Sequence, residues 1–137
     1  MMTIFIDTSV FVSFYNEADQ NHGKAKKIIS DIASGNYGKP MTSDYIFDEA
    51  VTVMLVRTKS LDHAVRMGQY IMDSVQIAVV NNAVLYAAWE LFRKGNKERM
   101  SFTDCTSRIF VEKFGIKTIA TFDTAFRKTE GINVIDG

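Results

Sequence analysis

Short apolar runs alternate along this chain with longer segments in which apolar residues recur every three or four positions. The short runs are rich in β-branched residues and are bounded by polar or turn-forming residues, a pattern typical of strands. A spacing of three or four instead predicts helices that bury one face. We therefore expect strands or short extended pieces at 3–6, 39–43, 75–80, 116–121 and 132–135. We expect helices at 9–15, 22–35, 44–57, 60–73, 81–95 and 101–115, with one helical turn at 123–128.

The alternation of strands and helices predicts a parallel sheet whose strands are joined by helical crossovers. We expect an α/β fold with three layers, α/β/α, around a central, mainly parallel sheet of four or five strands. The continuous β-branched run at 75–80 favours a strand covered on both faces. Ser60 is the expected N-cap of one helix, and Asn81 or Asn82 that of another. The length fits a single domain, 1–137, which is long enough to bury a core.

The composition is that of an ordinary soluble globular protein, with 47% hydrophobic and 23% charged residues. No run of 18 or more apolar residues is free of charge, which predicts no membrane span, and the N-terminus shows no secretory signal pattern. The single cysteine, Cys105, excludes an internal disulfide and suits a reducing compartment. We therefore expect a cytoplasmic protein.

The formal net charge is zero, with 16 basic and 16 acidic side chains. Proteins that bind nucleic acid through their overall charge are usually more basic than this. Any contact with nucleic acid must therefore come from local basic patches, and the candidates are 22–27, 92–99 and 126–128. Such patches are also common on solvated helix faces, so they do not decide the function by themselves.

Four acidic residues fall where a parallel sheet would bring them together. Asp7 ends the first strand, and Asp123 follows the fourth. Asp104 lies in the first turn of the last long helix, and Glu49 lies within the helix that follows the second extended piece. Ligands of open parallel sheets bind beyond the carboxyl ends of the strands. The order of elements therefore allows all four carboxylates to converge at one end of the sheet.

Each of these acids also has a simpler explanation. Asp7 could be a helix N-cap, and Asp104 could favour the positive end of a helix dipole. Asp123 could be a turn residue, and Glu49 could be a solvated helix residue in competition with its neighbour Asp48. A recurrent framing by hydroxyl and apolar residues, in IDTS, SFTDC and TFDTAF, favours a shared site for the four.

The segments FIDTSVFV, SDYIFDEAVTVML, MSFTDC and IATFDTAF resemble, in order and spacing, the four acidic motifs of the PIN domain family. The resemblance covers nearly the whole chain and is closest to small prokaryotic VapC-type ribonuclease toxins and stand-alone PIN proteins. It assigns Asp7, Glu49, Asp104 and Asp123 to the site, with Glu49 rather than Asp48 in the second motif. It implies an endonuclease acting on single-stranded RNA, as the toxin of a type II toxin–antitoxin pair. The preference for RNA over DNA rests on this resemblance alone.

Carboxylates held within a few ångströms of one another repel, and some of them protonate unless a cation is present. Mg²⁺ relieves that repulsion through oxygen ligands, and Mn²⁺ accepts the same set. The absence of a Cys and His cluster argues against zinc. We expect hydrolysis of phosphodiester bonds, with Asp7, Glu49 and Asp104 as direct or water-mediated metal ligands. Asp123 would be a further ligand or the group that positions the attacking water.

Other polar residues could support this chemistry. Thr8 and Thr121 could hydrogen-bond the carboxylates. His22 and His63 lie in polar parts of helical patterns, so we expect both at the surface. Five basic residues could guide the backbone of a single strand: Lys24, Arg93, Lys97, Arg99 and Arg127.

The remaining apolar features predict packing or interfaces. Cys105 lies on an apolar helix pattern and is expected in the core. Trp89, within AVLYAAWELF, is expected in the core or an interface rather than in a stacking platform. The helices at 44–57 and 60–73 carry more apolar surface than a small sheet covers, which predicts a homodimer face or a partner site. The residues concerned are Met54, Leu55, Met67, Ile71 and Met72. The family resemblance implies that an antitoxin could bind there.

Three alternatives share parts of this pattern. A PIN fold with little turnover could bind RNA or a protein partner, although such a module would not need all four acids. A nuclease of housekeeping RNA processing would use the same acids as a toxin. A phosphatase of the haloacid dehalogenase type also places an Asp after its first strand. That family needs a second acid two residues later, where this chain has Ser9.

Overall fold

The structure, a computed structural model, describes residues 2–95 and 99–137. Over these residues the chain forms one five-stranded sheet in the order β3-β2-β1-β4-β5, and each neighbouring pair is parallel. The strands are β1 (Thr3–Ile6), β2 (Lys39–Ser43), β3 (Gln76–Ala78), β4 (Thr118–Ala120) and β5 (Asn133–Ile135). The predicted parallel α/β sheet is therefore confirmed, with five strands in the part of the chain described.

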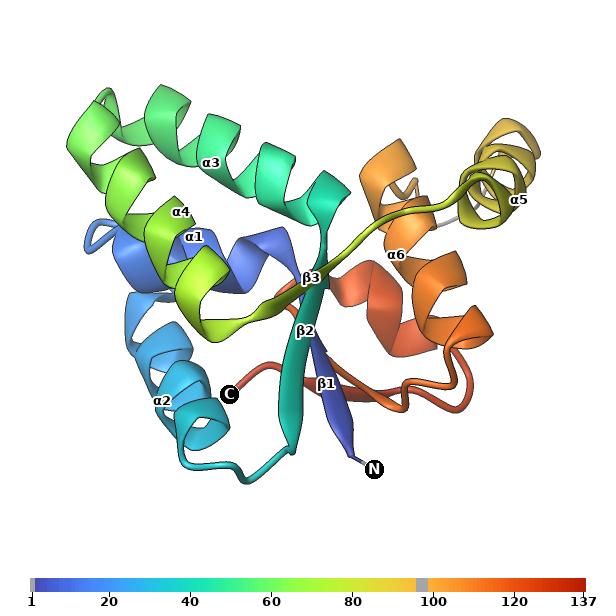
Figure 1. The fold of residues 1–137 in the computed structure, drawn as a ribbon, viewed down its shortest axis with the longest axis horizontal. Helices are drawn as coiled ribbons and strands as arrows, with labels where there is room; N and C mark the ends of the chain where they lie inside the picture. The colour runs from blue at the N-terminus through green and yellow to red at the C-terminus, as the bar shows by residue number, and fades with distance from the viewer. Residues whose placement is uncertain (1, 96–98) are drawn as a thin grey trace.

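Helices cover both faces of the sheet, which gives the predicted α/β/α layers (Figure 1). The helices α1 to α4 lie on one side, and α5 and α6 lie on the other. Their bounds are α1 (Thr8–Tyr15), α2 (His22–Ala33), α3 (Asp44–Thr58), α4 (Leu61–Ser74), α5 (Asn82–Arg93) and α6 (Phe102–Lys113). The predicted helical turn is a short 3-10 helix, η1 (Thr124–Lys128), between β4 and β5.

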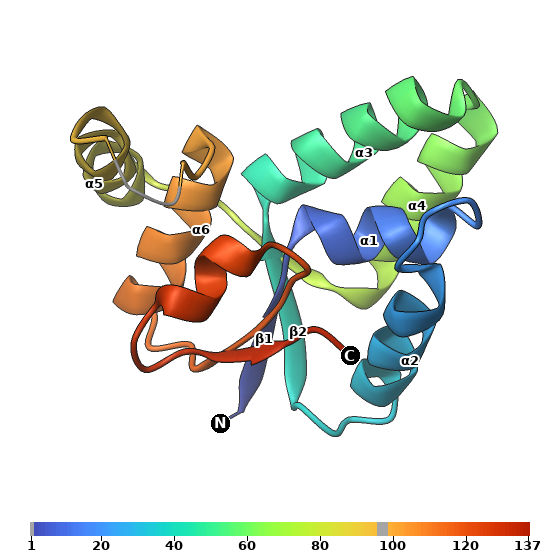
Figure 2. The same cartoon turned by 180° about the vertical axis from the view of Figure 1, so that it is seen from behind.

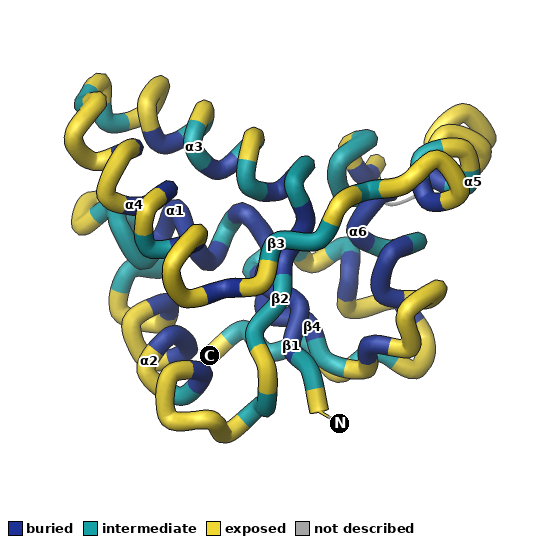
Figure 3. Tube along the Cα trace, viewed as in Figure 1, coloured by how far each residue is buried: buried dark blue, intermediate teal, exposed yellow. Residues whose placement is uncertain are grey.

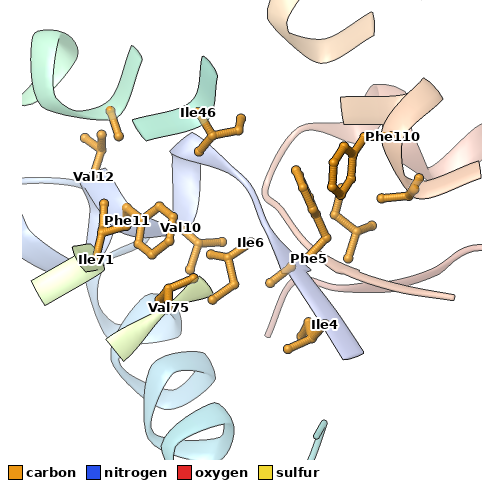
Figure 4. Close-up of a cluster of buried hydrophobic side chains, with 14 of the residues drawn as sticks. Ile4, Phe5, Ile6, Val10, Phe11, Val12, Ile46, Ile71, Val75 and Phe110 are labelled. Atoms are coloured by element: carbon orange, nitrogen blue, oxygen red, sulfur yellow. The ribbon is translucent and has the colours of Figure 1, made fainter. Parts of the chain in front are cut away.

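The central strand β1 anchors the core because its successive side chains point to opposite faces of the sheet. Phe5 packs towards α6, where its ring centroid lies 5.5 Å from that of Phe110 (Figure 4). Ile6 points the other way, towards Val10 of α1 and Val75. All five side chains are buried. A single strand therefore ties the two helical layers together and fixes the position of the residue that follows it, Asp7.

Polar caps fix where several helices begin, and those of α4 and α5 were predicted from the sequence. The side chains of Ser43, Ser60, Asn81 and Ser101 each accept a hydrogen bond from a backbone N–H in the first turn of α3, α4, α5 and α6 respectively. Asn81, and not Asn82, is the cap of α5. Such caps satisfy N–H groups that have no partner within the helix. They hold the starts of α3 and α6 at the carboxyl end of the sheet, where the candidate acids lie.

Two expectations about the strands need correction. The run at 75–80 is an edge strand, shorter than predicted, and Val79 is 70% exposed rather than covered on both faces. The β-branched residues there indicate a strand without indicating its place in the sheet. Strand β4 likewise spans only three of the six residues predicted.

Figure 3 shows exposed outer faces along the helices and buried positions at the centre of the sheet. No helix in the described ranges is long and apolar enough to cross a membrane.

Candidate active site

The four acids singled out from the sequence line one pocket of about 490 Å³, here called the carboxylate pocket. It lies beyond the carboxyl ends of β1 and β4. The starts of α1 and α6 and one face of α3 line it, and Figure 2 shows these helices converging at this end of the sheet. Asp7, Glu49, Asp104 and Asp123 come from four separate segments, and the fold brings all four to this pocket. A fifth acid, Asp19, also lines it and was missed by the sequence analysis.

Asp7 stands at the start of α1, but its side chain does not stabilise the helix as a cap. It occupies the N-cap position of α1, yet its side chain makes no capping hydrogen bond. Its Oδ2 accepts hydrogen bonds from the Thr121 hydroxyl at 2.7 Å and the Ser9 hydroxyl at 3.3 Å. Its Oδ1 is buried and has no hydrogen-bond partner. A buried carboxylate oxygen without a partner is costly, so the simple capping explanation for Asp7 fails.

The electrostatics of Asp7 show the same lack of a counter-charge. Burial raises its pKa from the ordinary 3.8 to about 6, although the hydrogen bond from Thr121 acts against that rise. The negative charges of Glu49 and Asp123 raise the pKa further. At neutral pH the carboxylate is therefore mostly ionised, but in an environment that disfavours its charge.

Asp104 combines a structural role with a place in the pocket. It forms a capping box with Ser101 at the start of α6: the Asp104 amide donates to the Ser101 hydroxyl, and the Ser101 amide donates to Asp104 Oδ2. The predicted role at the helix start is therefore real. Its pKa is nevertheless raised from 3.8 to about 7, by burial first and then by the charges of Asp7 and Asp123, against the lowering effect of the hydrogen bonds from Ser101.

Asp123 is linked to Asp7 through one hydroxyl. Its Oδ1 accepts the Ala125 amide at 2.9 Å, so the predicted turn role is real as well. Its own amide donates to the Thr121 hydroxyl oxygen at 3.0 Å, while that same hydroxyl donates to Asp7. Ser9 completes the link, because its hydroxyl oxygen accepts the Phe122 amide at 3.0 Å. These bonds tie the segment after β4 to the segment after β1.

Helix α3 presents Glu49 to the pocket and Asp48 to solvent. Glu49 is half-buried and lines the pocket together with Val53 and Arg57, which follow it at intervals of four residues on the same helix face. Asp48 is exposed and does not line it. Arg57 is the one basic side chain among the described lining residues, so a single guanidinium faces five carboxylates. The sequence analysis missed Arg57, although its helical spacing from Glu49 was a usable signal.

The donor set of this pocket suits a hard divalent cation. Carboxylate oxygens are the ligands that Mg²⁺ and Mn²⁺ prefer, and the unpartnered Oδ1 of Asp7 offers one of them. Among the residues described, no three Asp, Glu, His or Cys side chains are already grouped closely enough to hold an ion. Mg²⁺ usually keeps several of its waters, so a loose set of carboxylates still fits it.

The prediction that the Thr8 hydroxyl supports a carboxylate was wrong. That hydroxyl is buried without a partner, and the Ser9 hydroxyl bonds Asp7 instead; only the Thr8 backbone acts on Asp7, where its hydrogen bond lowers the pKa. His63 is exposed, and His22 is half-buried, with its Nδ1 2.8 Å from the Ser13 carbonyl oxygen. Because a carbonyl oxygen only accepts, His22 Nδ1 must carry a proton.

The four predicted basic guides that the structure describes do not line the carboxylate pocket. Arg93 pairs with Glu90, and Arg127 pairs with Asp136. Of the others, Lys24 and Arg99 are exposed, and Lys97 lies outside the described residues. All five residues belong to the basic patches 22–27, 92–99 and 126–128. These patches therefore remain candidates only for contacts with a nucleic-acid strand outside the carboxylate pocket.

The apolar predictions have mixed outcomes. Cys105 is fully buried, as expected. Trp89 is 51% exposed and is not a core residue; it lies against Phe92 and Phe102, with ring centroids 6.0 and 6.4 Å away. Of the five apolar residues singled out from the sequence on α3 and α4, three are core and two are exposed. The core residues are Met54, Met67 and Ile71, and the exposed ones are Leu55 and Met72.

Known proteins resemble this chain over most of its length. The profile of the PIN domain family matches residues 4–132. A VapC ribonuclease from Archaeoglobus fulgidus is 28% identical over 127 residues, which cover 91% of this chain and 80% of that protein.

Solved structures share the fold as well. VapC20 from Mycobacterium tuberculosis, described as a Sarcin-Ricin loop cleaving toxin, superposes with a TM-score of 0.78 and 29% identity, over 90% of this chain and 92% of that one. VapBC-1 from nontypeable Haemophilus influenzae has a TM-score of 0.69 over 98% of each chain, at 12% identity, and that likeness concerns the fold alone.

Proposed function

The chain belongs to the PIN domain family, and from this premise we propose that it is a divalent-cation-dependent ribonuclease that hydrolyses phosphodiester bonds of single-stranded RNA. Two similar proteins support the activity: one is named a VapC ribonuclease, and the other a toxin that cleaves the Sarcin-Ricin loop. Both are similar to this chain along about nine-tenths of its length.

The observation that carries this proposal is the state of Asp7. Its carboxylate is buried, one of its oxygens has no partner, and three further acids from distant segments line the same pocket. Four carboxylates in one partly buried pocket are unfavourable without a counter-charge, because like charges shielded from water repel. A bound cation removes that penalty, so the arrangement is understandable as one built for an ion.

Each acid has a role in the proposed reaction. Bound Mg²⁺ or Mn²⁺ would supply the positive charge that activates water and offsets the charge growing on the phosphoryl oxygens. Asp7, Glu49 and Asp104 would hold the ion, directly or through water. Asp123 would act as a ligand or accept a hydrogen bond from the attacking water. Thr121 keeps Asp7 Oδ2 in place, which leaves Oδ1 for the ion.

We also propose that this nuclease is the toxin of a toxin–antitoxin pair that acts in the cytoplasm. The likeness to a structure described as a toxin supports that role over housekeeping RNA processing. A shallow apolar groove between α3 and α4, of about 240 Å³, is where a second copy or an antitoxin could pack. Its lining includes Phe47, Val51, Leu55, Val65 and Met72. Exposed apolar surface of this kind often marks a protein interface.

The proposal is tested with a labelled single-stranded RNA pool incubated with the protein in Mg²⁺, in Mn²⁺ and in EDTA. We expect cleavage only with the metals, and none with the Asp104→Asn variant. Binding of the pool without cleavage under any of these conditions would instead support a module that binds RNA with little turnover. A short reading frame beside the gene, whose product binds this chain and stops cleavage, would support the toxin role.

A further inference from the structure

A second cavity of about 610 Å³ adjoins the carboxylate pocket, and Arg57 lines both. This cavity, here called the cationic pocket, lies between the end of α1, the loop after it, the start of α2, and the turn joining α3 to α4. Its lining residues are Phe14, Tyr15, Asn16, Glu17, Ala18, His22, Arg57, Thr58, His63 and Arg66. The proposed function gives no role to this cavity.

The charge of the cationic pocket is opposite to that of its neighbour. Arg57 and Arg66 carry full positive charges, and the imidazoles of His22 and His63 lie beside them in the lining. Among the described lining residues the one acid is Glu17, which is exposed. An ion pair joins Arg66 to Asp62 at 3.1 Å, but both side chains are about 70% exposed, and such surface pairs are weak. Arg66 therefore stays available to another anion.

The two pockets lie one after the other along the same face of α3. Glu49, Val53 and Arg57 lie on one face of α3, eight residues from first to last. At 1.5 Å per residue, Arg57 is roughly 12 Å along the helix from Glu49. A strand whose scissile phosphate lies against the carboxylates would therefore place a nearby phosphate beside Arg57 and the next part of its backbone towards Arg66.

Aromatic side chains flank the cations. Phe14 and Tyr15 line the cationic pocket and are half-buried, and Tyr70 packs on both with ring centroids 6.0 and 5.8 Å away. Burial raises the pKa of Tyr15, and the charge of Arg66 acts against that rise, so Arg66 lies near the phenol. Positive charge beside aromatic rings is the combination that single-stranded nucleic acid uses, with phosphates on the cations and bases against the rings.

We propose that the cationic pocket binds backbone phosphates of the RNA strand, away from the bond that is cut, and so holds the strand along α1 and α3. This inference rests on the proposed function, because it assigns the second cavity to the same substrate. The shared residue Arg57 favours RNA over a separate protein partner. The aromatic side chains beside these cations suit the bases of a single strand, and an acidic peptide has no such rings to place against them.

The test measures RNA affinity rather than activity. Every arm carries Asp104→Asn, so that the RNA is not cleaved, and contains Mg²⁺. The probe is a fluorescein-labelled single-stranded RNA of random sequence, and its anisotropy gives Kd over a series of NaCl concentrations. Each phosphate contact on a single strand contributes about 0.7 to the slope of log affinity against log salt. The double variant Arg57→Gln/Arg66→Gln should therefore lower the slope by about 1.4 and weaken binding roughly 25-fold at 0.1 M salt.

A matched control removes the same charge elsewhere. Lys113→Gln/Lys117→Gln lies at the end of α6 and before β4, at the opposite end of the sheet from both pockets. It should leave the slope unchanged. The single variant Arg66→Gln, which touches the cationic pocket but not the carboxylate pocket, should lower the slope by about 0.7. Thermal unfolding of each variant checks that these substitutions of exposed residues leave the fold intact.

The outcomes separate this inference from the proposed function. If the chain without substitutions cleaves RNA with Mg²⁺ but the arginine variants bind like the lysine control, the assignment of the cationic pocket is wrong. Equal losses in the arginine and lysine variants would overturn it too, since they would show a general effect of charge. Absence of metal-dependent cleavage in the unsubstituted chain is the separate failure of the proposed function.

Discussion

The hydroxyl of Thr121 donates a 2.7 Å hydrogen bond to Oδ2 of Asp7, across 114 residues of sequence. Both residues are buried, and each follows a central strand of the sheet, β4 and β1. The same hydroxyl oxygen accepts the Asp123 amide. One threonine therefore orients two of the four candidate acids, although it carries no charge.

Replacing that threonine should damage the site more than the fold. Thr121→Val keeps the shape but leaves Asp7 without its shortest hydrogen bond and the Asp123 amide without an acceptor. We expect the free energy of unfolding to fall by about 1–3 kcal/mol. Metal-dependent RNA cleavage should fall roughly tenfold or more, as for other groups that orient metal ligands. Urea unfolding and initial cleavage rates measure the two effects.

Thr106→Val is the matched control for that experiment. Thr106 is also fully buried, and its hydroxyl donates to the Thr103 carbonyl within α6 rather than to a site acid. It should lose stability without a comparable loss of the cleavage rate per folded molecule. Equal losses of cleavage in the two variants would mean that Thr121 has only a structural role.

Asp7→Asn should lower the cleavage activity and raise the stability of the metal-free protein. We expect cleavage to fall roughly a hundredfold or more, because a charged ligand is lost. The free energy of unfolding without metal should rise by up to about 3 kcal/mol at pH 8, since burial and repulsion no longer act on a charge. Cleavage equal to that of the unsubstituted chain would show that Asp7 is not a ligand.

The stability of the metal-free protein should fall as the pH rises from about 4 to about 7. The pKa values of Asp7 and Asp104 are raised from 3.8 to about 6 and about 7, so within this range the folded state holds more protons than the unfolded state. Stability therefore decreases with pH until both groups are ionised. Urea unfolding in EDTA at several pH values measures this, and the difference between the unsubstituted chain and Asp7→Asn isolates the part due to Asp7. A difference that does not change with pH would contradict the raised pKa of Asp7.

Two neighbouring acids on α3, Asp48 and Glu49, test whether the position of a carboxylate decides its effect on cleavage. Glu49→Gln should reduce metal-dependent cleavage at least tenfold, whereas Asp48→Asn should leave it unchanged, because Glu49 lines the pocket and Asp48 faces solvent. Both changes remove one negative charge from adjacent residues, so a general effect of charge would appear in both. Steady-state rates on one RNA substrate under saturating Mg²⁺ provide the comparison.

The sequence predicts the fold well because the physical signals for it are local. Apolar spacing and caps such as Ser60 and Asn81 indicated the helices to within a few residues. The order of strands in the sheet is not local, and β-branched composition did not indicate that β3 lies at an edge. Trp89 is not a core residue for a related reason: α5 packs mainly on α6, so one face of α5 stays exposed, and the alternative prediction of an interface is untested.

The candidate site was predictable where residue type and position coincide. The acids at strand ends and helix starts were named from the sequence, and the fold brings all four to one pocket. Their partners were harder, because a hydroxyl can reach several groups. Thr8 and Ser9 are adjacent after Asp7, and only the helix geometry decides that Ser9 bonds the carboxylate. Arg57 was missed because it lies eight residues from Glu49 in sequence, yet on the same helix face.

Calorimetric titration of Mn²⁺ into the metal-free protein at pH 7.5 tests most directly whether these four side chains bind one cation together. We expect saturable binding by the unsubstituted chain and by Asp48→Asn. Binding should be clearly weaker in each of the variants Asp7→Asn, Glu49→Gln and Asp104→Asn, and a similar loss in Asp123→Asn would make Asp123 a ligand rather than the group that positions water. Failure of the unsubstituted chain to bind Mn²⁺, or undiminished binding by Asp7→Asn, would contradict the proposed cation site.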